Sequence, residues 1–200
     1  MNIDRAWLSR RAVDVAPDLL GALITRTSAE GAVTIRLAEV EAYEGADDPG
    51  SHAYRGLTER NAVMFGPAGH VYVYFTYGMH WCANLVCGPE GVASAVLLRA
   101  GEVVEGVELA RERRPAARRD RDLARGPARL AAALGLDQSN YGTDALAADG
   151  DVCLQAVAGR RPPIGTGPRV GLANGATRPW RFWLDGDPTV SQYRPHKARR

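Results

Sequence analysis

The stretch HVYVYFTYGMHWCANLVC, residues 70–87, decides the fold class of this 200-residue chain. β-Branched and aromatic residues fill it, a composition typical of strands, and it predicts two strands over residues 69–77 and 80–87. Gly78 lies between them and marks a turn from which the ring of Tyr77 can project at the sheet edge. Because a connection this short joins antiparallel neighbours, the stretch predicts a protruding β-hairpin.

Segments on either side of the hairpin extend the sheet and add helices. Further strands are predicted over residues 33–43, 93–103, 152–157, 168–172 and 181–184. Short amphipathic helices are predicted between residues 5 and 24, the second capped by Asp14 with Pro17 in its first turn. Further helices are predicted after Val103, over residues 104–113, and over residues 127–136. The expected fold is α+β: a single domain over residues 1–195 around a curved, mainly antiparallel sheet with flanking helices, followed by a basic tail over 196–200.

Composition excludes several classes of protein. A hydrophobic share of 46% and a charged share of 24% fit one globular core. Charged residues interrupt the N-terminus, and no apolar run reaches membrane-spanning length. The cysteines Cys82, Cys87 and Cys153 form no CxxC pair and have no histidine at zinc-finger spacing. We therefore expect a reduced, cytoplasmic protein without a structural metal.

The basic residues are almost all arginine. Lys197 is the only lysine, and the net charge of +2 is too small to establish an anionic partner. Arginine matches phosphate oxygens better than lysine does, although a codon bias would give the same composition. The run from Arg111 to Arg129 has the same two interpretations: a solvated face or connector, or a strip that contacts phosphates.

The segment LAEVEAY, residues 37–43, holds a pair of carboxylates. Because side chains alternate along a strand, Glu39 and Glu41 share one face and could serve acid and base chemistry. A charged residue on an exposed strand face is also commonplace, so the spacing alone leaves both interpretations open.

Aromatic side chains crowd into residues 70–81 of a chain with only 7% aromatic residues. For Tyr72 and Phe75, core packing is the favoured interpretation, and the same default applies to His80 and Trp81. Before this cluster lies a loop over residues 44–67, rich in Gly, Asp and Pro, with a short helix predicted over 59–64. Loops of this length in compact domains commonly carry function.

Read in order, these motifs resemble the signature of the alkyladenine (3-methyladenine) DNA glycosylase family. The matching positions are Glu41-Ala-Tyr43, His52, Thr58-Glu-Arg-Asn61, Met64-Phe65, Tyr72-Val-Tyr74, Tyr77-Gly-Met79, Asn84, Val96-Leu-Leu-Arg-Ala100, Gly126-Pro127 with Leu130, and Gly167-Pro-Arg-Val-Gly171. Each motif is weak alone, but their common order and spacing over nearly the whole chain make a strong signal.

The resemblance implies an enzyme that turns a damaged purine nucleotide out of duplex DNA, because C1′ cannot be reached inside the helix. Tyr77 matches the family's wedge in the minor groove. Tyr43, His52 and Tyr74 match the positions that stack on the extruded base, and stacking favours cationic alkylated purines further. Asn84 matches the residue that excludes the exocyclic amino group of normal guanine.

The resemblance also implies a catalytic role for Glu41 as the base that activates water. Glu39 would then be a supporting residue, and Arg99 would lie beside both the catalytic glutamate and the DNA backbone. No cofactor and no metal are implied. The expected partner is damaged double-stranded DNA, acted on by a monomer, with 3-methyladenine, 7-methylguanine, hypoxanthine and ethenoadenine as candidate lesions.

Two other function classes fit part of the pattern. A non-catalytic nucleic-acid-binding module would use the same hairpin and arginines. A glycosidase acting on free nucleosides or sugars would use Glu39 and Glu41, whose Cα separation of roughly 7 Å on a strand suits a two-carboxylate mechanism. That scheme leaves Tyr77 and Arg99 without a role.

Overall fold

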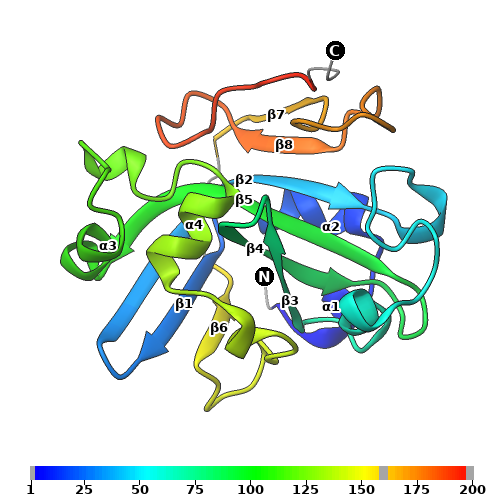
Figure 1. Ribbon diagram of the computed structural model, residues 1–200, viewed down its shortest axis with the longest axis horizontal. Coiled ribbons are helices and arrows are strands. Elements are labelled where there is room, and N and C mark those ends of the chain that lie inside the picture. Colours follow the sequence, from blue (N-terminus) through cyan, green and yellow to red (C-terminus); the bar gives the residue numbers. More distant parts are fainter. Residues whose placement is uncertain (1–2, 158–161, 197–200) are drawn as a thin grey trace.

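The computed structural model describes residues 3–157 and 162–196, and its described strands form one eight-stranded, entirely antiparallel sheet (Figure 1). The order along the main path is β3 (Val71–Thr76), β4 (His80–Cys87), β5 (Ser94–Glu105), β2 (Gly31–Tyr43), β1 (Leu23–Ser28) and β6 (Val152–Gln155). Off this path, β8 (Arg181–Leu184) pairs with β2 and with β7 (Ile164–Gly167). With its helices, this curled sheet confirms the predicted α+β class.

Strand β2 is long enough to serve three neighbours. Its N-terminal half pairs with β1 on one edge, whereas Glu39–Glu41 pair there with β8, and β5 pairs along the other edge. The β2–β5 register shifts on both sides of Glu39, an irregularity of the kind that twists a strand and re-aims its side chains. Because β8 pairs with Glu39–Glu41, the orange β7–β8 pair lies across one end of the molecule, above β2 in Figure 1.

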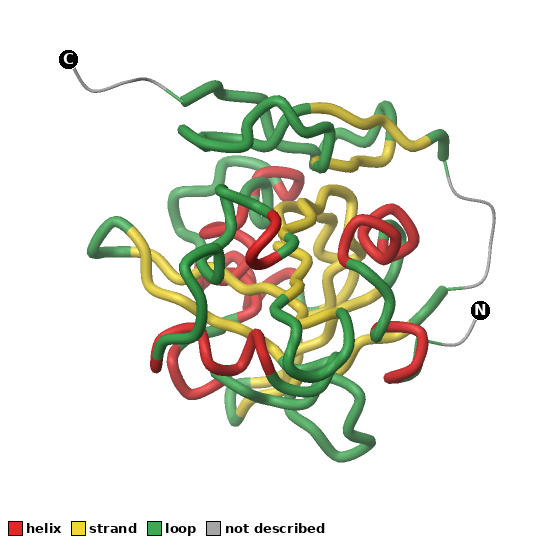
Figure 2. Tube along the Cα trace, turned by 90° about the vertical axis from the view of Figure 1, so that its right-hand side faces the viewer, coloured by secondary structure: helices red, strands yellow, loops and turns green. Residues whose placement is uncertain are grey.

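Helices surround the strands, as the tube view in Figure 2 shows. The α-helices are α1 (Arg5–Leu8), α2 (Ala12–Leu19), α3 (Val107–Arg113) and α4 (Pro127–Leu134), and short 3-10 turns cover Gly45–Asp47, Glu59–Phe65, Asp120–Asp122 and Gln138–Asn140. In α2 the buried residues are Ala12, Val15, Ala16 and Leu19. This i, i+3, i+4, i+7 spacing is the apolar stripe that places a helix against a core. No described helix is long and apolar enough to cross a membrane.

The predicted start of α2 is wrong. Arg11 occupies its N-cap position, Asp14 lies in the first turn, and Pro17 lies inside the helix. Instead of a local cap, the first amides use distant side chains: Ala12 N–H donates to Ser94 Oγ at 3.0 Å, and Val13 N–H donates to Glu44 Oε1 at 3.0 Å. Tertiary contacts thus satisfy the orphan donors that a local cap would otherwise take.

Other boundaries also differ from the predictions. Leu23 and Ile24, assigned to a helix from their apolar spacing, begin β1, and β5 runs to Glu105, so that α3 starts at Val107. Helix α4 ends at Leu134 because Gly135 adopts a left-handed conformation there. The short helix predicted over 59–64 is present as a 3-10 helix over Glu59–Phe65. Of the predicted basic tail, residues 197–200 lie outside the described residues.

Two packed clusters make up the interior. The larger joins α2 and α4 to the sheet, and the smaller lies under the 44–67 loop and contains Met64 and Tyr72. Core packing of Tyr72 is confirmed by its 1% exposure. For Phe75 the prediction is wrong, because Phe75 is 45% exposed and its ring lies 4.8 Å from that of Trp81 near the end of the hairpin. His80 is exposed, so its expected core role is wrong, because the hairpin has left the core by that residue.

The arginine-rich run is held largely on the protein itself. Arg111 pairs with Glu108 and Asp120, and Arg113 pairs with Glu30. Arg119 and Arg125 both pair with Asp122. These pairs support the interpretation of the run as a solvated connector around α3 and α4.

Candidate active site

A row of side chains crosses four strands on one face of the sheet. Glu41 on β2 lies opposite Leu97 on β5, Leu97 lies opposite Asn84 on β4, and Asn84 lies opposite Tyr72 on β3. Directly opposed residues of antiparallel strands project to the same side. The predicted face of Glu41 is therefore also the face of the aromatic hairpin.

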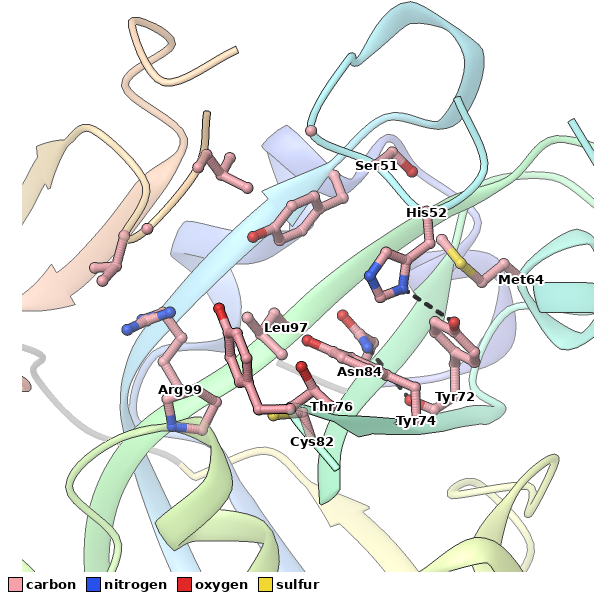
Figure 3. A pocket seen from close by; sticks show the side chains of 17 residues that line it. Ser51, His52, Met64, Tyr72, Tyr74, Thr76, Cys82, Asn84, Leu97 and Arg99 are labelled. Carbon is pink, nitrogen blue, oxygen red and sulfur yellow. Dashed lines mark hydrogen bonds between the residues drawn. The ribbon is translucent and has the colours of Figure 1, made fainter. Parts of the chain in front are cut away.

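A cavity of about 380 Å³ lies over this row, within the range of small-molecule sites. Its lining combines the sheet face, the 44–67 loop and the loop after β7: Tyr43, Gly50, Ser51, His52, Met64, Tyr72, Tyr74, Thr76, Tyr77, Cys82, Asn84, Leu97, Arg99, Pro127, Val170, Gly171 and Leu172. Figure 3 shows His52 and Arg99 at opposite ends of the cavity, with Tyr74, Asn84 and Leu97 between them. Every predicted site residue except Glu41 lines it.

Glu41 lies directly behind this lining. Its side chain is fully buried, and three groups that do line the cavity hold its carboxylate. Val170 N–H donates to Oε1 at 2.7 Å, the Tyr43 hydroxyl donates to Oε2 at 2.8 Å, and Arg99 Nη1 lies 3.3 Å from Oε1. Such donors stabilise an ionised carboxylate in a buried place and leave further lone-pair sites for a water molecule.

Arg99 joins the two glutamates of β2. Its Nε donates to Glu39 Oε1 at 2.7 Å, and Arg181 Nε donates to the same oxygen at 2.8 Å. Burial alone raises the pKa of the Glu39 carboxyl, but the charges of the two guanidinium groups outweigh it and hold that pKa below its usual value. Burial lowers the pKa of Arg99, and the carboxylates of Glu41 and Glu39 more than reverse this. Glu39 and Arg99 therefore carry full opposite charges.

The far wall of the cavity is aromatic. The rings of Tyr72 and Tyr74 stack at 5.5 Å with an interplanar angle of 26°, and the ring of His52 meets Tyr74 edge-on at 4.6 Å. His52 Nδ1 lies 3.0 Å from the Tyr72 hydroxyl (Figure 3). Burial, and secondarily the charge of Arg60, lowers the pKa of His52, so its ring is neutral at neutral pH. A planar, apolar ring system fits such a wall.

Asn61 and Asn84 fix parts of this wall through their amides. Asn61 is 1% exposed, and its Nδ2 donates to the carbonyls of His52 at 3.1 Å and Gly56 at 3.0 Å, which anchors the loop that carries His52. Asn84 Nδ2 donates to the Tyr72 carbonyl at 3.3 Å. The motif containing Asn61 was part of the resemblance, but its anchoring role was not predicted.

Tyr77 occupies the tip of the β3–β4 hairpin, and its predicted exposure at a turn is confirmed. Met79 N–H donates to the Thr76 carbonyl at 3.3 Å, and both central residues of this turn have positive φ, 52° for Tyr77 and 68° for Gly78. Tyr77 is the only described non-glycine residue with positive φ, and its side chain is 86% exposed. A two-residue hairpin turn of this kind needs positive φ at both central positions, and a bulky residue there costs about 1–2 kcal/mol.

A buried ion pair that the sequence analysis did not identify supports the cavity from behind. Arg169 and Asp48 are both fully buried, and Arg169 Nη2 donates to Asp48 Oδ1 at 2.7 Å. Arg169 Nη1 also donates to the Ala42 carbonyl at 2.9 Å, and its guanidinium lies 4.5 Å from the centre of the Tyr43 ring. The pair ties the 44–67 loop to the loop after β7, beside the ring of Tyr43.

The segment 168–172, predicted as a strand, is instead the loop that supplies the Val170 amide to Glu41. The neighbouring strand is β7, which ends at Gly167. Pro168 and the left-handed Gly171 explain the difference, since proline ends a strand and positive φ makes a turn. These two residues were the signal that could have identified the loop.

Comparison with known proteins matches nearly the whole chain to one protein family. The family model of the methylpurine-DNA glycosylases matches residues 6–188. A relative in Streptomyces avermitilis, named as a 3-methyladenine DNA glycosylase, is 59% identical over 201 residues, which cover 99% of this chain and 94% of the relative. A relative of the same name in Leifsonia xyli is 54% identical over 195 residues, covering 94% of this chain and 90% of the relative.

A ring-lined cavity above buried carboxylates, in a chain with these relatives, defines a DNA N-glycosylase, an enzyme of DNA repair. More specifically, the chain belongs to the methylpurine-DNA glycosylase family.

Proposed function

We propose that this protein turns an alkylated or deaminated purine nucleotide out of duplex DNA into the cavity and hydrolyses its N-glycosidic bond with a water molecule activated by Glu41. The observation that carries the proposal is the position of Glu41, held by Tyr43, Arg99 and the Val170 amide directly behind the lining of an aromatic cavity. The product is an abasic site and a free purine.

In the proposed reaction, water enters the end of the cavity beside Arg99 and Val170. Its oxygen attacks C1′ as the bond to the purine nitrogen breaks, and its proton passes to Glu41. The ionised carboxylate also offsets the positive charge that develops on the sugar. A general base contributes about 10²- to 10⁴-fold to such a step. A cationic purine such as 3-methyladenine leaves as a neutral molecule, so the protein need not protonate it.

The aromatic wall would hold the purine. Tyr43, His52 and Tyr74 all line the cavity. Stacking contributes about 1–3 kcal/mol per base, which offsets part of the cost of unstacking it from the duplex. Because His52 is neutral, it would not repel a cationic lesion, and it could contact the edge of a neutral one such as hypoxanthine or ethenoadenine. Asn84, in the row that forms the sheet face of the cavity, would exclude the amino group of guanine.

Tyr77 would fill the gap left in the helix. Its exposed ring stands at the hairpin tip next to the mouth of the same cavity. The Arg99 guanidinium, in contrast, is 5% exposed and already binds both glutamates, so its proposed contact with the DNA backbone would be made from within the cavity. The enzyme would act on the chromosome in the cytoplasm, without metal or cofactor.

A base-release assay tests the proposal. Duplex oligonucleotides, each with one 3-methyladenine, 7-methylguanine, hypoxanthine or ethenoadenine, are incubated with the protein in EDTA, and abasic strands are cleaved with alkali and counted. Glu41→Gln should lower single-turnover release by about 100-fold or more while binding lesion DNA. The matched control is Glu102→Gln, which removes an exposed carboxylate of β5 and should release base normally. Release by Glu41→Gln at the control rate would contradict the proposal, and release from free nucleosides would favour the nucleosidase alternative.

A further inference from the structure

Arg99 is shared between two buried carboxylates, and the sharing is uneven. Its Nε donates to Glu39 Oε1 at 2.7 Å, whereas its Nη1 lies 3.3 Å from Glu41 Oε1. The nearer, hydrogen-bonded partner is therefore the carboxylate that the proposed reaction does not use. Arginine and carboxylate groups often pair through two parallel hydrogen bonds. Because the Arg99 Nε donates to Glu39, the guanidinium makes only a single contact with Glu41.

Glu39 is itself held from three further directions. Arg181 Nε donates to it at 2.8 Å, Ser191 N–H at 2.6 Å and Ser191 Oγ at 2.9 Å. Arg181 lies on β8, and Ser191 lies in the segment Thr189–Arg194, which we call the C-terminal strap. The strap also accepts a hydrogen bond of 3.1 Å from Gly171 N–H at the Arg194 carbonyl, next to the loop residue that binds Glu41. The strap thus supports two of the three groups that hold the Glu41 carboxylate, Arg99 and the Val170 amide.

The charges in this buried group balance: Glu39 and Glu41 are the two anions, and Arg99 and Arg181 the two cations. The other groups that face Glu41 are the hydroxyls of Tyr43 and Tyr74 and the Val170 amide. Burial raises the pKa of both tyrosines well above the usual value, so they stay neutral. Changing one charge therefore alters the field at Glu41 directly.

We propose that Glu39, held in place by Ser191, is a positioning residue of the glycosylase reaction: it draws the charge of Arg99 away from Glu41, which keeps Glu41 able to accept a proton from water, and the charge of Arg181, which shares the same Glu39 oxygen, limits this effect. This inference rests on the proposed role of Glu41. Without the Glu39 charge, two guanidinium groups would face one carboxylate, and Glu41 would hold its negative charge more tightly and be a weaker base. Without the Arg181 charge, the opposite would follow.

The test uses single-turnover base release as a function of pH, with rates corrected for the active fraction by titration with lesion DNA. The acid limb of this profile reports the protonation of the general base. Glu39→Gln should lower the plateau on the order of 10- to 100-fold, as misplacement of a reacting group does. Its acid limb should move to lower pH, as the loss of a nearby like charge does. Arg181→Gln should move the acid limb to higher pH.

The double variant Glu39→Gln with Arg181→Gln restores the charge balance and should return the acid limb close to its wild-type position. Glu102→Gln, an exposed carboxylate on the adjacent strand, should leave the profile unchanged. Opposite shifts in the two single variants could not come from a merely structural role, since loss of stability changes the active fraction and not the acid limb. Unshifted limbs, or shifts in the same direction, would overturn the inference.

Two results keep this inference separate from the proposed function. If wild type releases base and Glu41→Gln does not, while the Glu39 and Arg181 variants keep the wild-type limb, only the positioning role fails. If Glu39→Gln does not fold, Ser191→Ala takes its place, because it removes one hydrogen bond from Glu39 and the 3.4 Å contact of Arg99 with Ser191 Oγ. Ser191→Ala should slow release without weakening lesion binding, and a wild-type rate would overturn the inference.

Discussion

The Tyr43 hydroxyl donates a 2.8 Å hydrogen bond to Glu41 Oε2, so the side chain that lines the cavity also holds the carboxylate behind it. Burial, and then the charge of Glu41, raises the pKa of Tyr43 well above its usual value, which keeps the hydroxyl a donor at neutral pH. In the proposed function, a base stacked on this ring would therefore contact a residue that also positions Glu41.

Tyr43→Phe separates these two roles. The ring and its stacking surface remain, whereas a hydrogen bond to a charged group, worth about 1.5–3 kcal/mol, is lost. Single-turnover base release should fall about tenfold or more, and the Kd for lesion DNA should change little. Equal losses in rate and affinity, measured by single-turnover kinetics and titration, would show that the hydroxyl only shapes the cavity.

The buried pair of Asp48 and Arg169 should matter for stability. Asp48→Asn leaves a fully buried guanidinium without its counter-charge, which should lower the free energy of unfolding by about 3 kcal/mol. The matched control is Asp18→Asn, because Asp18 forms an exposed pair with Arg10 and should contribute little. Urea denaturation of both variants measures the difference, and equal losses would contradict the assignment.

The same pair predicts a pH dependence. Burial raises the pKa of Asp48, but hydrogen bonds and charge from Arg169 outweigh it, so that the folded-state pKa lies below the usual value. A lowered pKa contributes stability that is present above the unfolded value, about 4, and is lost as the pH falls through the folded value. The gap in unfolding free energy between wild type and Asp48→Asn should therefore shrink below about pH 4. A constant gap would mean that folding does not shift the pKa of Asp48.

How much the sequence could predict depended on the range of the interaction. Alternation along β2 put Glu39 and Glu41 on one face, and Gly78 marked the turn that exposes Tyr77, because both signals are local. Asp48 and Arg169, in contrast, are 121 residues apart, and no local sequence pattern indicates that they pair. The family resemblance brought the distant motifs together, but not the contacts of Glu39 with Ser191.

Helix α2 shows the same limit and allows a direct measurement. Its first amide donates to Ser94 Oγ, a buried side chain of β5. Sequence rules for helix caps consider only neighbouring residues, so they could not have identified Ser94. Ser94→Ala leaves the Ala12 amide unsatisfied and should lower the free energy of unfolding by about 1 kcal/mol, as the loss of an ordinary N-cap does. Base release at a temperature where both proteins are folded should not change. Undiminished stability would mean that water replaces the hydroxyl.

Tyr77 has a conformation that its own fold does not favour. At φ 52° its backbone would suit glycine better, and its ring is 86% exposed. Tyr77→Gly should therefore keep or slightly raise the Tm, because relief of the left-handed strain offsets the added freedom of the unfolded chain. Duplex lesion binding and base release should both fall, and release from single-stranded DNA, where no gap must be filled, should fall less.

Met79→Ser, which removes an apolar side chain 68% exposed at the same turn, controls for loss of apolar surface. A markedly lower Tm for Tyr77→Gly would assign the ring to the fold, and an unchanged preference for duplex over single strand would remove it from the wedge role.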